Sequence, residues 1–183
     1  MGEKTKLKLL HILNILKEDS DEETILTTSD IIDKLQDKGI IAERRSVIRD
    51  IKTLEAFGYD ISLYEENKQG YYLRSREFEE EELRILIDTV SASKSITTKK
   101  SKELIDKLKK LTSKNLGKKI VGQVYVDEKI KSKNERIYYN VNALSSAIEE
   151  NKKVNFKYTT YNINKQLEYR KKGKTYKVSP YGL

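Results

Sequence analysis

The feature that most constrains the fold of this chain is a two-faced helical pattern that runs from Glu43 to Gly58. Three apolar residues share one side of the helical wheel, within about 60° of one another: Val47, Ile51 and Leu54. Three cations fall on the opposite side, roughly 140° to 200° from Val47: Arg45, Arg49 and Lys52. The pattern predicts a helix that packs on a core with one face and presents positive charge with the other.

Two shorter helical patterns precede this segment. Residues 5–18 have apolar positions at helical spacing with lysines on the other side, and the acidic run at residues 19–23 ends the pattern. Thr28 or Ser29 is expected to cap a second short helix, which Gly39 stops at its C-terminal end. Three helices with a tight connection between the second and the third predict a helix-turn-helix.

A strand-turn-strand pattern follows Gly58. Residues 59–64 and 71–74 have strand character, and residues 65–70 between them have the composition of a turn. A hairpin directly after the third helix is the wing of a winged helix-turn-helix. We therefore predict a DNA-binding domain of this kind in residues 1–76.

The rest of the chain is expected to form two further parts, which gives an α+β protein. Residues 77–136 predict a helical connector, with helices at residues 79–90 and 99–111 and a short strand at residues 120–126. Residues 137–183 predict a helix that is followed by three strand-like runs, at residues 153–158, 167–170 and 175–178.

The net charge of +8 is distributed unevenly along the chain. Residues 1–76 have 13 Lys and Arg against 15 Asp and Glu, a net charge of −2, whereas residues 114–183 have 16 against 6, a net charge of +10. The case for DNA binding by the N-terminal part therefore depends on the local arrangement of its cations. The basic C-terminal part suits an anionic ligand or, alternatively, is a lysine-rich solvated surface.

The segment Glu43-Arg44-Arg45-Ser46-Val47-Ile48-Arg49-Asp50-Ile51, followed by Leu54 and Gly58, resembles the recognition-helix motif of DeoR-type winged-helix regulators. That motif usually reads Ser-Arg-Arg-Thr-hydrophobic-x-Arg-Asp-hydrophobic, so this chain differs from it at Glu43 and Ser46. In the hairpin, Lys68-Gln69-Gly70-Tyr71-Tyr72-Leu73 is similar to the family's Gly-Gly-Tyr-x-Leu segment. Together, the wheel and the resemblance imply a set of DNA-binding residues: Arg44, Arg45, Ser46, Arg49, Lys52, Thr53 and Lys68.

Three stretches of the C-terminal part resemble the opening of a WYL domain: Ala147-Ile148, residues 153–158 and residues 176–181. WYL domains have an Sm-like β-barrel, are commonly joined to winged helices of this type, and act as ligand-sensing modules of transcription regulators. The resemblance implies the N-terminal part of such a domain in residues 137–183, with an anionic or nucleic-acid effector. The chain has no tryptophan, so the Trp-Tyr-Leu segment that names the family is expected beyond Leu183; the alternative is a shortened member of the family.

The composition excludes several other functions. Without cysteine the chain has no disulfide, thiolate metal site or cysteine nucleophile. His11 is the only histidine and no phosphate-cradling glycine-rich loop is present, so we expect neither an enzyme nor a cofactor. The longest apolar stretch near the N-terminus, at residues 9–16, is too short to cross a membrane, which favours a cytoplasmic protein.

The expected partners are double-stranded DNA and a second copy of the chain. Regulators of this type usually pair two half-sites, and the predicted connector helices have more apolar surface than a spacer needs. The expected dimer contact lies within residues 77–183 and includes these side chains: Leu83, Ile85, Leu86, Leu104, Leu108 and Leu111. The alternative is a protein–protein interaction module that uses a winged helix without sequence-specific DNA binding.

Overall fold

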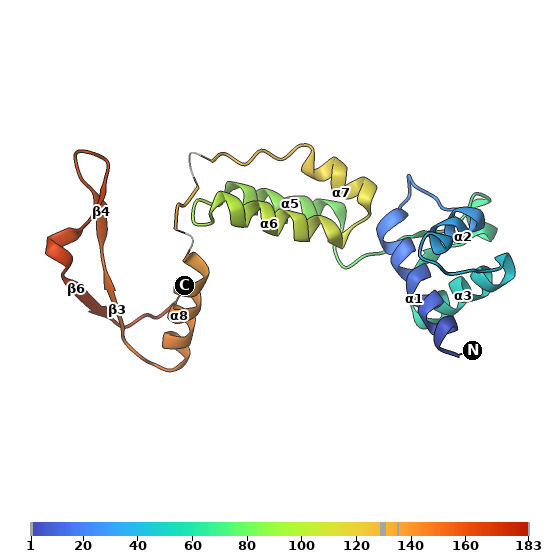
Figure 1. Cartoon of the computed structure of the whole chain (residues 1–183), viewed down its shortest axis with the longest axis horizontal. Helices are drawn as coiled ribbons and strands as arrows, with labels where there is room; N and C mark the ends of the chain where they lie inside the picture. The colour runs from blue at the N-terminus through green and yellow to red at the C-terminus, as the bar shows by residue number, and fades with distance from the viewer. Residues whose placement is uncertain (1, 129–130, 135, 183) are drawn as a thin grey trace. The chain divides into compact units, whose positions relative to one another are not determined.

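The computed structural model describes residues 2–128, 131–134 and 136–182. The protein is 53% helical and 13% strand, an α+β protein whose sheets are small (Figure 1). Contacts within the chain divide it into two units, Met1–Lys131 and Ser132–Leu183. None of the described helices is long and apolar enough to cross a membrane.

The first unit begins with three helices and a small antiparallel hairpin. The helices are α1 (Gly2–Asp19), α2 (Thr28–Gln36) and α3 (Arg44–Phe57). The hairpin contains two strands with a one-turn helix in the loop between them: β1 (Ile61–Ser62), α4 (Tyr64–Asn67) and β2 (Tyr72–Leu73). We call residues 2–76 the helix-hairpin region.

The local sequence sets where α2 begins and where α3 ends. Thr27 is the N-cap of α2, because its side chain accepts a hydrogen bond from the Asp30 N–H and Asp30 accepts one from the Thr27 N–H. The prediction of Thr28 or Ser29 is wrong, since only Thr27 has a carboxylate three residues later. Gly58 ends α3 as predicted, with a φ of 116° in the left-handed region that favours glycine.

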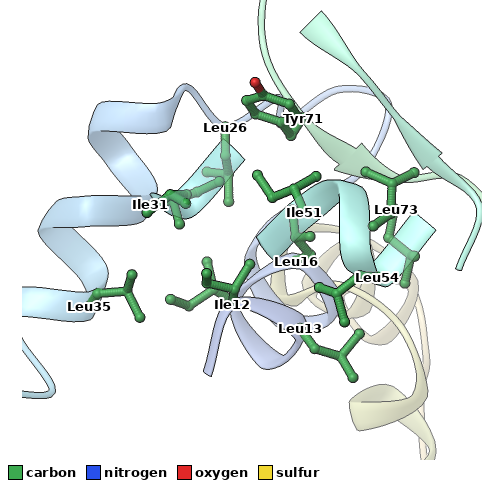
Figure 2. Packing of buried hydrophobic residues seen from close by; sticks show 13 residues of the cluster. Ile12, Leu13, Leu16, Leu26, Ile31, Leu35, Ile51, Leu54, Tyr71 and Leu73 are labelled. Atoms are coloured by element: carbon green, nitrogen blue, oxygen red, sulfur yellow. The ribbon is translucent and has the colours of Figure 1, made fainter. Parts of the chain in front are cut away.

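One apolar core joins the three helices to the hairpin (Figure 2). Six of its side chains have an exposed fraction of 0%: Ile12, Leu16, Ile31, Leu35, Val47 and Ile51. Leu54, the third residue of the predicted buried face of α3, is 4% exposed. The predicted orientation of α3 is therefore confirmed, and burial of each such side chain contributes about 1.5 to 3 kcal/mol.

The remainder of the first unit is helical. Its elements are α5 (Glu80–Ala92), α6 (Thr98–Leu108), the 3-10 turn η1 (Lys109–Leu111) and α7 (Lys114–Val121). They share a second core, formed by Leu83, Ile87, Ile105 and Ile120. The predicted strand at residues 120–126 is wrong, because α7 continues to Val121 and buries Ile120 in this core.

The second unit contains one helix and an antiparallel two-stranded ribbon. In chain order its elements are α8 (Ile137–Glu149), β3 (Val154–Lys157), β4 (Thr159–Tyr161), β5 (Leu167–Tyr169), the 3-10 segment η2 (Arg170–Gly173) and β6 (Thr175–Val178). β3 pairs with β6, and β4, which the sequence did not predict as a separate strand, pairs with β5. These sheets form no closed barrel within the described residues.

Gly70 lies where the hairpin comes closest to the segment that precedes α2. Leu26 and Tyr71 exchange two backbone hydrogen bonds, of 2.8 and 3.0 Å, which draw the two chain segments together. A Cβ atom at Gly70 would lie 2.2 Å from the carbonyl oxygen of Leu26. Any side chain at this position therefore has to displace backbone.

Replacement of Gly70 by alanine is expected to lower the free energy of unfolding by about 1 to 3 kcal/mol, because the added methyl group overpacks a site closed by backbone. The measurement is urea unfolding followed by circular dichroism. Gly182→Ala is the control, since a Cβ atom at Gly182 meets nothing within 4 Å. Equal unfolding midpoints for the two variants would contradict the prediction.

Candidate nucleic-acid interface

The outward face of α3 presents arginine side chains to solvent. Arg44, Arg45 and Arg49 are all exposed. None of the three makes an ion pair or a side-chain hydrogen bond within the part of the chain that the structure describes. Their positive charge is therefore available to an external anion, as the helical wheel predicts for Arg45 and Arg49.

The inward face of α3 is fixed by a buried ion pair with α1. Lys8 Nζ lies 2.9 Å from Asp50 Oδ2, and the two side chains are only 10% and 9% exposed. The same ammonium group also donates to the hydroxyl of Ser46. Lys8 therefore lies on the buried side of α1, which corrects the prediction that the lysines of this helix all point away from the core.

Ser46 is half-buried, and its hydroxyl oxygen is occupied by the contact with Lys8. Because the hydroxyl accepts in this contact, its own hydrogen remains available for donation. The sequence places Ser46 among the DNA-binding residues. In the structure it also links α3 to α1, a role that no local sequence pattern predicts.

Lys52 and Thr53 are exposed on α3, but each already has a partner in the protein. Lys52 Nζ lies 3.2 Å from Glu65 Oε1 at the tip of the hairpin. Thr53 donates its hydroxyl hydrogen to the Arg49 carbonyl oxygen at 3.0 Å. The pKa of Glu65 lies below its ordinary value, because the carboxylate accepts a hydrogen bond from the Glu65 backbone N–H and, with a smaller effect, one from Lys52.

The hairpin loop is held in shape by Asn67. Its side-chain oxygen accepts hydrogen bonds from the N–H groups of Gln69 and Gly70, at 2.6 and 2.9 Å, and its side-chain nitrogen donates to the Gly70 carbonyl at 3.0 Å. Lys68 follows in the left-handed conformation, with a φ of 60°. Its ammonium group is exposed and donates to the Glu65 carbonyl at 2.7 Å, so the predicted tip lysine folds back on its own loop.

A hollow of about 330 Å³ lies between the start of α2, the start of α3 and the hairpin. Its lining includes hydroxyl groups from the α2 end, the guanidinium-bearing Arg44 from α3, and hairpin residues: Thr27, Thr28, Ser29, Ile32, Arg44, Tyr64, Gln69 and Gly70. Arg44 is the one cation in this lining, so the hollow offers an anion a guanidinium group beside hydroxyl groups.

The seven predicted site residues thus have different surroundings. Arg45 and Arg49 share the side of α3 opposite its buried face, whereas Arg44, in the first turn of the helix, lines the hollow beside the start of α2. The structure joins Lys52 to the hairpin, turns Ser46 toward α1, and bonds Lys68 within its loop. No group of histidine, cysteine and carboxylate side chains that could hold a metal ion is present among the described residues.

Comparison of this chain with protein-family models, with curated proteins and with solved structures found no match.

Removal of the buried ammonium group in Lys8→Met is expected to lower the free energy of unfolding by about 3 to 5 kcal/mol, because the Asp50 carboxylate is left buried without a counter-charge. The double variant Lys8→Met/Asp50→Leu is expected to recover most of this loss. Denaturant unfolding of the two single variants and the double variant gives the coupling energy. Additive effects of the two substitutions would show that the pair is not coupled.

Proposed function

We propose that this protein is a sequence-specific DNA-binding transcription regulator, and that residues 1–76 are a winged helix-turn-helix. The observation that carries the proposal is the division of α3 into a buried apolar face and an opposite, exposed face with Arg45 and Arg49, neither of which pairs with a side chain that the structure describes. In this assignment α3 is the recognition helix, α2 is the helix before it, and the β1–β2 hairpin is the wing.

The physical case depends on what a major groove offers. The groove of B-form DNA admits one α-helix, and guanine presents two acceptors there that a guanidinium group reads with two hydrogen bonds. Arg45 and Arg49 are the proposed base-reading residues, because they lie opposite the buried face. Arg44, Thr53 and the Ser46 hydroxyl are proposed to bond phosphates or base edges beside them.

The hairpin is proposed to contact the DNA backbone. Lys68 is exposed at its tip, and release of its bond to the Glu65 carbonyl leaves an ammonium group for a phosphate. Lys52 is proposed to act with it, since its ion pair with Glu65 is solvent-exposed and contributes little to stability. These contacts set position and affinity without reading sequence.

The remaining parts are proposed to serve dimerisation and sensing. Leu83 is fully buried in the second core, Leu108 packs against the same core, and Leu104 is half-buried. The proposed dimer face is therefore narrower than the predicted one and uses Ile85, Leu86 and Leu111, which are exposed. We assign residues 137–183 to the opening of a WYL-type domain with an Sm-like fold that responds to an anionic effector. A regulator of this kind acts on chromosomal DNA in the cytoplasm, as expected from the sequence.

Alanine substitution of Arg45 or Arg49 is expected to weaken binding to a duplex selected from a random pool by about 1 to 3 kcal/mol each and to relax preference at one base pair. Lys68→Ala is expected to weaken all duplexes about equally and to reduce the salt dependence of binding. The measurement is a gel-shift titration of the full chain across a salt series.

Lys94→Ala is the matched control for these substitutions, because Lys94 is an exposed lysine between α5 and α6. It is expected to leave the affinity unchanged. If Arg45→Ala and Arg49→Ala bind the selected duplex as tightly as the unsubstituted chain, α3 is not the recognition helix. Retention of a protein partner by these variants, without DNA binding by any form of the chain, would favour the interaction module instead.

Glu65→Gln is expected to raise the affinity for duplex DNA about threefold, because it removes a negative charge beside the proposed interface and releases Lys52 from its ion pair. The slope of log affinity against log salt concentration should steepen by up to about the amount that one phosphate contact contributes. Glu22→Gln, an exposed carboxylate in the loop after α1, is the control. An affinity gain of equal size in both variants would indicate a general effect of net charge.

A further inference from the structure

A second concave surface of the first unit lies where η1 and α7 meet the C-terminal end of α1. It encloses about 430 Å³, and four of its lining residues are lysines: Lys109, Lys110, Lys114 and Lys118. Glu18 is the one carboxylate that lines it. We call this surface the lysine hollow; none of the DNA-binding residues proposed above belongs to it.

The charges around the lysine hollow are only partly compensated. Lys109 pairs with Asp106 at 2.9 Å, and Lys114 pairs with Glu18 and with Asp19, at 2.9 Å each. Lys110 and Lys118 are exposed, and neither forms an ion pair with a residue that the structure describes. The hollow therefore holds two uncompensated positive charges and a third, Lys114, shared between carboxylates.

Close packing of α7 on η1 keeps these lysines together. Gly117 lies so near η1 that a Cβ atom there would be 2.9 Å from the Lys109 carbonyl oxygen. Thr112, between η1 and α7, is 5% exposed. Because lysine buries an aliphatic stem and keeps its ammonium group in water, the hollow combines apolar walls with a cationic rim. Such a lining fits a small anion that carries an apolar body.

The lysine hollow is separate from the proposed DNA interface. Glu18 lies ten positions after Lys8 in α1, about 15 Å along the helix axis from the residue that contacts Ser46 of α3. A concave volume of this size also admits a small molecule but not the width of a duplex. The chemistry therefore favours a small organic phosphate over a nucleic-acid backbone.

We propose that the lysine hollow binds a small organic phosphate ester, with its phosphate group on Lys110, Lys118 and Lys114 and its organic part against the lysine stems. The bound dianion competes with Glu18 and Asp19 for Lys114. Asp19 also pairs with Lys34 of α2 at 3.1 Å, so the competition alters a carboxylate that joins α1, α2 and α7. The site thereby gives a small anion a direct effect on the helix-hairpin region, whatever that region binds.

The test is calorimetric titration of the full chain with phenyl phosphate and with phenyl sulfate, which has the same body and one charge fewer. Phenyl phosphate is expected to bind at least tenfold more tightly. Lys110→Gln/Lys118→Gln should weaken phenyl phosphate binding at least tenfold, because it removes two ammonium groups whose hydrogen bonds to the phosphate are stronger than those between neutral groups. Glu18→Gln should strengthen it about threefold by removing a like charge from the hollow.

Lys94→Gln/Lys99→Gln is the matched control, because it removes two exposed lysine charges of the first unit that do not line the hollow. It should change the affinity less than twofold. The proposal is overturned if phenyl phosphate gives no binding heat at millimolar concentration, if both lysine pairs lose equal affinity, or if Glu18→Gln gains none. Since misfolding cannot raise an affinity, the Glu18→Gln result is independent of any loss of fold in the other variants.

Discussion

The packing of α1 against α3 is the contact on which the rest of the helix-hairpin region depends. Ile12 and Leu16 of α1 and Val47 and Ile51 of α3 have no exposed surface, and Leu54 has almost none. At about 1.5 to 3 kcal/mol for each side chain, this burial outweighs any surface ion pair in the region. Burial of the apolar face of α3 therefore determines which face is exposed. Arg45 and Arg49 point to solvent because the apolar residues on the opposite side are packed in the core.

Apolar burial alone does not fix how α3 is rotated about its axis, since aliphatic side chains tolerate small shifts. The ion pair between Lys8 and Asp50 adds that restriction. A rotation of α3 by one residue, about 100°, would separate the two opposite charges and leave each of them buried without its partner. An unpaired buried charge lowers the free energy of unfolding far more than an unpaired charge at the surface. This restriction on the rotation of α3 explains why Asp50 lies on the inner side of a helix whose outer side is basic. The coupling energy between Lys8 and Asp50 measures the strength of the restriction.

The sequence predicts those features that depend on one element at a time. The buried face of α3 follows from helical periodicity, and the end at Gly58 follows from the left-handed conformation that glycine adopts. The strand predicted at residues 120–126 fails because its β-branched residues suggest a strand, whereas Ile120 is buried against α5 and α6 in the second core. Tertiary packing, which the local pattern does not contain, decides the conformation there.

For the candidate site too, the sequence predicts what depends on a single helix and not what depends on contacts between elements. The wheel identifies the cations of α3, but it does not say which of them lies within reach of another element. Lys52 pairs with Glu65 only because the hairpin folds back toward α3. Lys8 pairs with Asp50 only because α1 packs against α3. One signal for Lys8 was present, since Lys8, Ile12 and Ile15 share a face at helical spacing. A lysine on an apolar face predicts a buried partner of opposite charge.

The contact of α1 with α7 differs in kind from the contact of α1 with α3. It is made by polar and charged groups from the end of α1 and from the loop that follows it. Lys114 of α7 pairs with Glu18 and Asp19 of α1. In the loop, Glu23 pairs with Lys119, and Asp21 accepts a hydrogen bond from the hydroxyl of Ser113, the N-cap of α7. Burial alone would raise the pKa of Asp19, but hydrogen bonds from Lys114 and Lys34 outweigh it and hold the pKa below 3.8. A carboxylate with a lowered pKa stabilises the folded contact above its ordinary pKa and loses that contribution as it is protonated below. The apolar side chains that pack α1 on α3 carry no charge, so salt, acid or a competing anion acts directly on the α7 contact and not on this part of the α1–α3 packing.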